Sequence, residues 1–129
     1  MTARFLALYE TPAGPEAFDR HYREVRIPLL RQLRGLRRYS VSRDLTALHG
    51  APYYLVTELE WDTMDELRAA FASPQGQATA AGAARLQELA PVRRTIFTAD
   101  DYAMQAPASA PPPGGAPKVQ NSTPEPPRS

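Results

Sequence analysis

The residue types best suited to chemistry lie together in the segment 18–29. Tyr22 and Arg26 are four residues apart, so they share one face if the segment is helical. Pro28 has no N–H group and crowds the carbonyl of Glu24, which predicts a kink or loosening of the helix at this place. A phenol and a guanidinium would then point into the space between the helix and a sheet. His21 lies one step round the helix and is the third catalytic candidate.

A purely structural interpretation is open for the same three residues. Tyr22 would fill the core with its hydroxyl at the rim, Arg26 would extend its charged head to solvent, and His21 would be a surface residue. On residue patterns alone, this structural interpretation is the favoured one.

Most other kinds of site are disfavoured by what the sequence lacks. It has no cysteine and two histidines, His21 and His49, so we expect no metal site. It has no Gly-rich phosphate loop and no GxSxG or HExxH motif. The formal net charge is +1, which gives no reason to expect nucleic acid or a membrane as partner. The apolar run Phe5–Tyr9 is too short for a membrane span or a signal peptide, so we expect a cytoplasmic protein.

Helical periodicity and capping signals predict the elements that must position these side chains. Pro15 opens a helix whose apolar face is spaced by threes and fours, and Gly35 ends it. That face is made of Phe18, Tyr22, Val25, Leu29 and Leu33. Thr63 and Glu66 form a capping box for a helix over Met64–Ala72. Ser73-Pro74 starts a further helix that continues to about Leu89.

Four apolar runs with turn residues between them predict strands. They are Arg4–Glu10, Leu36–Leu45, Tyr53–Trp61 and Val92–Asp100, with a hairpin loop over 46–52. The order βαββαβ predicts an α+β, ferredoxin-like fold, whose four-stranded antiparallel sheet carries helices on one face. Alternation leaves open which face of each strand meets the helices. A face with Tyr54 and Val56 would stay uncovered, and a second copy is its simplest cover, so we expect a homodimer.

Composition divides the chain near residue 102. Residues 103–129 hold eight of the fourteen prolines and almost no large aliphatic side chains. Such a segment buries too little surface to offset its ordering entropy. We therefore predict a folded domain over 1–102 and a disordered Pro-rich tail over 103–129.

Several motifs together make the chain resemble the EthD family of the dimeric α/β-barrel superfamily. They are Phe18-Asp19 through Tyr22 to Pro28-Leu29, Pro52-Tyr53-Tyr54, Glu58-Leu59, and Phe71-Ala72-Ser73-Pro74 with Gly76. The resemblance covers about residues 4–100. It implies a homodimer whose two sheets close a barrel, and a ligand cavity between sheet and helices in each subunit. Relatives include cofactor-free monooxygenases, polyketide cyclases, lactone isomerases, haem-binding enzymes and members with no known activity.

The chain departs from this family at Arg26, where EthD-like sequences commonly have histidine. Arginine stays charged, so it does not shuttle protons near neutral pH. The acid/base role could have moved to His21 or a tyrosine, Arg26 could bind an anionic or enolate-like group, or the site could be inactive. Haem is disfavoured because arginine is no axial ligand, and we expect no cofactor.

Two functions follow from the resemblance. We favour a lyase, isomerase, cyclase or cofactor-free oxygenase for a small, largely apolar or aromatic organic molecule, with Tyr9, Tyr39, Trp61 and Phe71 lining its pocket. The alternative is a non-catalytic ligand-binding or accessory homodimer of a catabolic or biosynthetic pathway, which the missing histidine supports.

Overall fold

Four strands form one antiparallel sheet in the computed structural model, which describes residues 1–105. They are β1 (Thr2–Tyr9), β2 (Arg38–Ser42), β3 (Leu55–Trp61) and β4 (Val92–Ala99), arranged in the order β2-β3-β1-β4. The two strands at the centre, β1 and β3, pair with Phe5 opposite Leu59, and β4 pairs with β1 so that Ile96 lies beside Phe5. The predicted ferredoxin-like order is confirmed.

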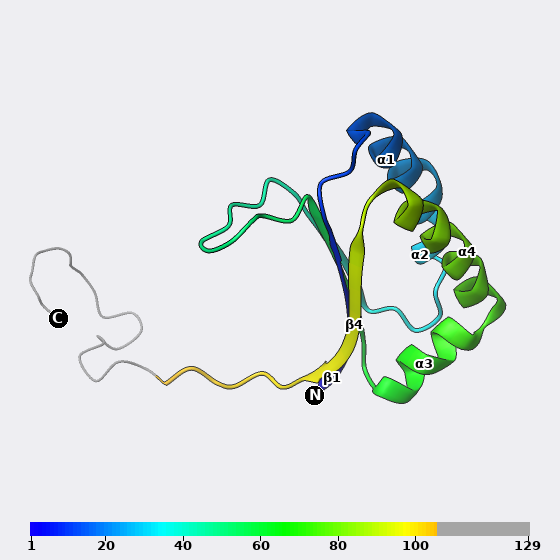
Figure 1. Ribbon diagram of the computed structural model, residues 1–129. Helices are drawn as coiled ribbons and strands as arrows, with labels where there is room; N and C mark the ends of the chain where they lie inside the picture. Colours follow the sequence, from blue (N-terminus) through cyan, green and yellow to red (C-terminus); the bar gives the residue numbers. More distant parts are fainter. Residues whose placement is uncertain (106–129) are drawn as a thin grey trace, which may run out of the picture.

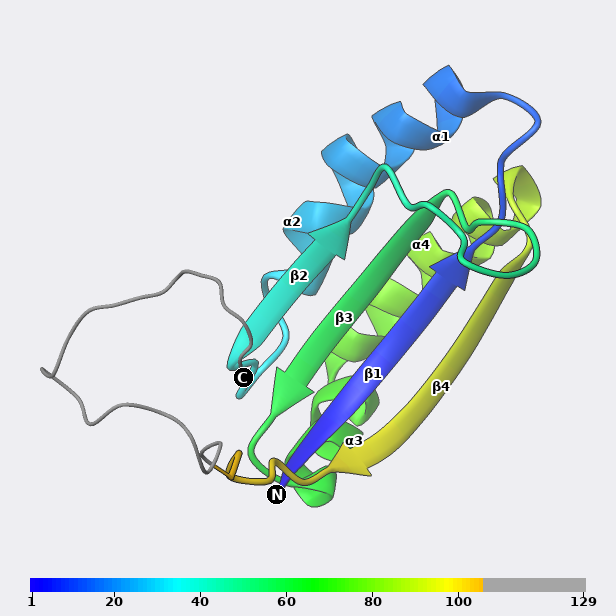
Figure 2. The same ribbon diagram turned by 90° about the vertical axis from the view of Figure 1, so that its left-hand side faces the viewer.

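The helices cover one face of this sheet and leave the other face open (Figure 1; Figure 2). They are α1 (Pro15–His21), the π-helical turn η1 (Tyr22–Arg26), α2 (Ile27–Leu30), α3 (Met64–Ala72) and α4 (Pro74–Leu89). Both predicted caps are present. The Thr63 hydroxyl accepts a hydrogen bond from the Glu66 N–H at 3.1 Å, and the Ser73 hydroxyl accepts one from the Gly76 N–H at 3.1 Å.

Strand alternation decides which side chains form the core beneath the helices. Every second residue of β1 and β3 is buried, in agreement with the two-residue period of a strand. The buried set is Ala3, Phe5, Ala7, Tyr9, Leu55, Thr57, Leu59 and Trp61. The other face of β1 and β3 carries Leu6, Leu8, Val56, Glu58 and Glu60, and no helix within residues 1–105 covers it. Tyr54 was expected on that face, but it lies just before β3, where its ring packs edge-on against Phe18 of α1 and its hydroxyl donates to Asp19 at 2.9 Å.

The first helical segment differs from its prediction in two respects. It ends at Leu30 rather than at Gly35, whose φ of +72° lies in the left-handed region where the chain turns toward β2. Val25 was expected on the apolar face, but it is 37% exposed and Arg26 is buried instead. The prediction assumed a regular α-helix, whereas η1 shifts the inward face by one residue.

The strands are also shorter than predicted at several ends, most clearly for β2, which begins at Arg38 and stops at Ser42. The predicted tail, 103–129, lies almost wholly outside the described residues. Within residues 1–105, no helix is long and apolar enough to cross a bilayer.

Candidate active site

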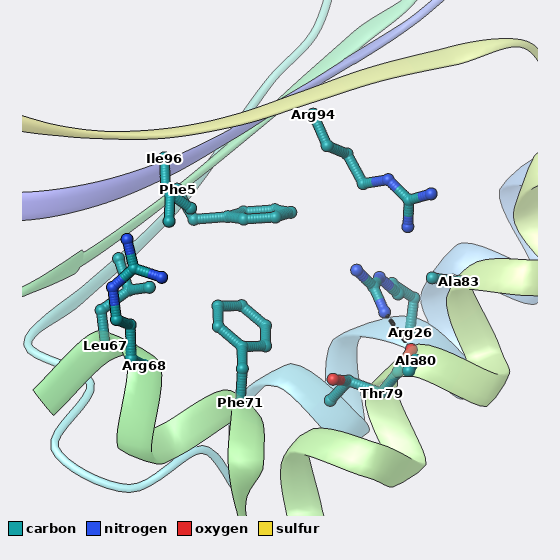
Figure 3. A pocket seen from close by; sticks show the side chains of 10 residues that line it. All are labelled: Phe5, Arg26, Leu67, Arg68, Phe71, Thr79, Ala80, Ala83, Arg94 and Ile96. Atoms are coloured by element: carbon teal, nitrogen blue, oxygen red, sulfur yellow. Dashed lines mark hydrogen bonds between the residues drawn. The ribbon is translucent and has the colours of Figure 1, made fainter. Parts of the chain in front are cut away.

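A cavity of about 470 Å³ lies between the sheet and the helices α3 and α4 (Figure 3). Its size is that of a small-molecule site. Phe5, Leu67, Phe71, Ala80, Ala83 and Ile96 supply the apolar part of its wall, and Arg26, Arg68, Thr79 and Arg94 supply the polar part. The Phe5 and Phe71 rings touch, with their centroids 5.3 Å apart. The cavity is therefore apolar, with arginine as its charged component.

Arg26 reaches this cavity from the π-helical turn. Ile27 donates its N–H to the carbonyl of Tyr22, five residues earlier, one residue before the position at which Pro28 interrupts the helix. The widened turn directs both Tyr22 and Arg26 inward, and Arg26 is only 2% exposed. Its Nη1 donates to the Thr79 carbonyl of α4 at 2.6 Å, whereas its buried Nε has no partner among the described residues. Arg26 is thus a buried cation that is incompletely hydrogen bonded.

A chain of hydroxyl groups lies near Arg26. The Tyr22 hydroxyl is 2.8 Å from the Tyr39 hydroxyl of β2 and 2.5 Å from Thr57 Oγ1 of β3. The Tyr9 ring packs edge-on against the Tyr22 ring, at 6.2 Å between centroids. The four residues lie on three strands and one helical turn, so they bind the first helical segment to the sheet.

Burial further favours the neutral form of these phenols. It raises the pKa values of Tyr9, Tyr22 and Tyr39, and the positive charge of Arg26 opposes the increase in each case. In Tyr39 the hydrogen bond to Tyr22 raises the pKa further. The three hydroxyls are therefore hydrogen-bond donors and acceptors at neutral pH, not phenolate bases.

Arg94 faces the cavity from the edge strand β4. It pairs with Ala7, whose small side chain leaves space on the inner face of the sheet. Figure 3 shows its guanidinium directed toward that of Arg26. Arg94 Nη2 also donates to Gln87 Oε1 at 3.0 Å. Among the described residues, neither arginine has a carboxylate within ion-pair distance.

The domain profile of EthD matches residues 10–90. This chain belongs to the EthD family. It is 36% identical over 83 residues to an uncharacterized 11.0 kDa protein of Rhodococcus erythropolis, from the thcB-thcC intergenic region, covering 63% of this chain and 80% of that protein. It is also similar to a solved EthD family protein of Bacillus halodurans, with a TM-score of 0.70 and 30% identity over 78% of this chain and 100% of that one.

More distant solved structures share the fold. SnoaB of Streptomyces nogalater, a cofactor-independent oxygenase, superimposes with a TM-score of 0.58 at 18% identity, over 81% of this chain and 98% of SnoaB. A dimeric ferredoxin-like protein of unknown function from Thermobifida fusca gives a TM-score of 0.53 at 24% identity, over 77% of this chain and 92% of that one. Dimeric proteins are therefore among the structural neighbours of this EthD chain.

The predicted site residues of this EthD chain fall into three groups. Arg26 and Phe71 line the cavity. Tyr9, Tyr22 and the partly buried Tyr39 form a cluster beside Arg26, and Trp61 packs behind Phe71 at 5.5 Å between ring centroids. His21 is separate, because it contacts the Gly82 carbonyl of α4 at 3.4 Å and lines a different, smaller pocket. Its catalytic role stays a prediction.

The largest omission of the sequence prediction was Arg94. The sequence places Val92 and Ile96 two residues to either side of it, a spacing that puts all three on one strand face. Because Arg93 precedes it directly, an arginine lies on each face of the predicted strand. Alternation alone therefore did not show which of the two arginines faces the helices. Thr79, Ala80 and Ala83 were also missed, since small residues on a helix carry no chemical signal.

The arrangement favours binding over proton transfer. Of the described residues that line the cavity of this EthD protein, none is His, Asp or Glu. No group of three or more His, Asp or Glu within residues 1–105 is arranged to hold a metal ion. What the site provides is an apolar chamber with fixed positive charge, which stabilises negative charge on a bound molecule.

Proposed function

We propose that this EthD-family protein is an enzyme that acts on a small, largely apolar organic molecule held in the cavity, without a cofactor. One observation carries the proposal: Arg26 is buried at the cavity wall. Among the described residues, its Nε has no hydrogen-bond partner and no carboxylate forms an ion pair with it. A buried charge without a counterion destabilises the fold, so its position calls for a role in the site.

In this proposal Arg26 stabilises negative charge that develops on the substrate. Those lyase, isomerase, cyclase and cofactor-free oxygenase reactions that pass through enolate-like or other anionic species would be favoured by a fixed guanidinium. Tyr22 and Tyr39 remain protonated, so their hydrogen-bond chain holds the tyrosines and Thr57 in place beside Arg26. That SnoaB, a neighbour in fold, is a cofactor-independent oxygenase supports oxygenation as one of these reactions.

A non-catalytic ligand-binding protein is the second candidate. It is favoured by the lack of His, Asp and Glu among the described residues of the cavity wall. Such a protein needs the chamber but no group that titrates near neutral pH.

Turnover separates the two candidates. Small aromatic and polyketide-like compounds would be screened by thermal shift, and each compound that binds would be incubated with the protein in air and analysed by mass spectrometry. For a converted compound, Arg26→Ala should lower turnover by ~10²–10³, the effect of losing one charge-stabilising donor. Arg26→Lys should restore it only in part, because an ammonium lacks the planar fork. Arg31→Ala is the control, since Arg31 is exposed on the same helical segment. Binding compounds that are never converted would favour the second candidate.

We propose further that the protein is a homodimer formed through the uncovered sheet face. Leu6, Leu8, Val56 and Phe97 lie on that face among charged residues. The loop between β2 and β3 projects from the same side, and its Leu48 is fully exposed (Figure 1). A second copy would cover both features, in line with the dimeric neighbours.

Light scattering at micromolar concentration tests this assembly. The expected mass is about twice the 14.2 kDa of one chain. Leu48→Asp should shift the equilibrium toward monomer, whereas Leu45→Asp, nearer the start of the loop and partly covered, is a matched comparison. A monomer with an unchanged melting temperature would contradict the proposal.

A further inference from the structure

We propose that the cavity selects organic acids: a carboxylate is held between Arg26 and Arg94, and an aromatic or short aliphatic body lies against Phe5 and Phe71. This inference deepens the proposed function, because it names the substrate class of the same cavity.

The first observation is that two guanidinium groups converge on one end of the cavity. Arg26 approaches from η1 and Arg94 from β4, and Figure 3 shows their heads directed toward each other across the open space. A guanidinium carries five N–H donors. Among the described residues, Arg26 donates to the Thr79 carbonyl and lies beside the Tyr9 hydroxyl, and Arg94 donates to Gln87, so each group keeps N–H donors for a ligand.

The second observation is that the charge of this pair is uncompensated. The ion pairs among the described residues involve other arginines, such as Arg4 with Glu58 and Glu60, or Arg85 with Glu88. Two like charges facing each other repel, and water screens the buried Arg26 less than it screens the exposed Arg94. An anion between them removes the repulsion and supplies acceptors for both groups.

The geometry of guanidinium groups favours a carboxylate as that anion. A planar guanidinium binds the two oxygens of a carboxylate through parallel N–H···O bonds, and two such groups can share its four lone-pair positions. Arg94 is exposed at the rim and Arg26 is buried, so the carboxylate would meet Arg94 first and then reach Arg26. A carboxylate that enters in this order is paired with a guanidinium at each stage, first Arg94 and then also Arg26, while it loses its hydration water.

The remaining wall of the cavity indicates which kind of ligand body would fit beside the carboxylate. Away from the arginine pair, the wall is mostly apolar, with the alanines of α4 opposite the sheet and Arg68 of α3 at the far end; its apolar members there are Phe5, Leu67, Phe71 and Ile96. Figure 3 shows the Phe5 and Phe71 rings beside the open space in front of the arginines. An aromatic ring can pack on their edges and faces. A cavity of about 470 Å³ accepts a compact molecule with one acidic end.

Paired probes test the inference directly. Naphthalene-2-carboxylate and naphthalene-2-carboxamide have the same ring and nearly the same shape, but only the first is an anion at pH 7. Isothermal titration calorimetry with the full chain should show at least a tenfold preference for the carboxylate. The preference should fall to threefold or less in Arg94→Gln and in Arg26→Met. Arg93→Gln is the matched control, because Arg93 is the adjacent residue on the opposite face of β4, and it should keep the preference.

Each outcome separates the inference from the proposed function. Equal affinity for the two probes would overturn the inference and leave the apolar cavity as a ligand site. A preference that survives both Arg26→Met and Arg94→Gln would also overturn it, because the anion would bind elsewhere. If neither probe binds and neither protects Phe71→Cys from a thiol reagent, the cavity is no site for such ligands, and both the inference and the proposed function fail.

Discussion

Replacing Arg26 by methionine should stabilise the free protein while it removes function. The substitution keeps a long side chain and deletes the charge. It gives up the hydrogen bond to the Thr79 carbonyl, and a bond to a charged group contributes about 1.5–3 kcal/mol. That carbonyl lies inside α4, where a main-chain N–H one turn later is available to it.

The opposing effect is the relief of a buried charge. Removing an ion from water costs several kcal/mol, and at Arg26 neither a described carboxylate nor a partner for Nε offsets this cost. We therefore expect Arg26→Met to raise the free energy of unfolding by about 1–3 kcal/mol. In a domain of about a hundred residues, each kcal/mol moves the melting temperature by about 4–8 °C.

Differential scanning calorimetry without ligand measures this directly, with Arg31→Met as the control for an exposed arginine on the same segment. The control should melt within about 2 °C of the wild type, since exposed substitutions change stability little. A melting temperature for Arg26→Met that is clearly below that of the control would show that the guanidinium is a structural anchor. The burial of Arg26 would then serve the stability of the fold and would not indicate a role in the site.

Three further predictions concern the surroundings of the site. Tyr22→Phe removes the hydroxyl that bonds both Thr57 and Tyr39, and urea unfolding should show a loss of about 1–3 kcal/mol, against no loss for Tyr102→Phe at an exposed position. The pKa values of Tyr9, Tyr22 and Tyr39 are raised in the folded state, so the stability that their protonated forms contribute is present below about pH 10 and is lost as the pH rises above it. Urea midpoints measured from pH 8 to 11 should decline in the wild type, and a flat profile would contradict the shifts. Gly76→Ala would force a Cβ atom against the Phe71 carbonyl where α3 meets α4, and should destabilise by about 1–3 kcal/mol or more; Gly14→Ala, with nothing within 4 Å, is the control for a tolerated change.

Local signals were sufficient for the order of elements. The capping hydroxyls of Thr63 and Ser73 start α3 and α4 where the sequence predicts, because a cap involves only residues of the same turn. Strand alternation predicted that Val56 lies on the uncovered face, which is where it is found, and Leu55, Leu59 and Trp61 on the opposite face of β3 are buried. The EthD motifs predicted the family, and the family match confirms it.

The site itself depends on contacts that no local pattern describes. Pro28 predicted a loosened helix, and the structure has a π-helical turn there, which places Arg26 instead of Val25 on the inner face. Whether that turn forms depends on the space that α4 and the sheet leave for the Arg26 side chain. Arg94 enters the cavity because Ala7 lies beside it on β1, more than eighty residues earlier. A register of this kind follows only from the assembled sheet.

The alanines of α4 suggest how relatives could diverge. Ala80 and Ala83 form the wall opposite the sheet, on a regular helix, and their side chains are the shortest that still favour a helix. Substituting either one by valine or leucine would reduce the volume of the chamber without moving the backbone or either arginine. If the arginine pair anchors an acid group as proposed, the size of the accepted molecule and its charge are set by different residues. Single substitutions on α4 would then change the range of compounds and leave the anchor for the acid group in place.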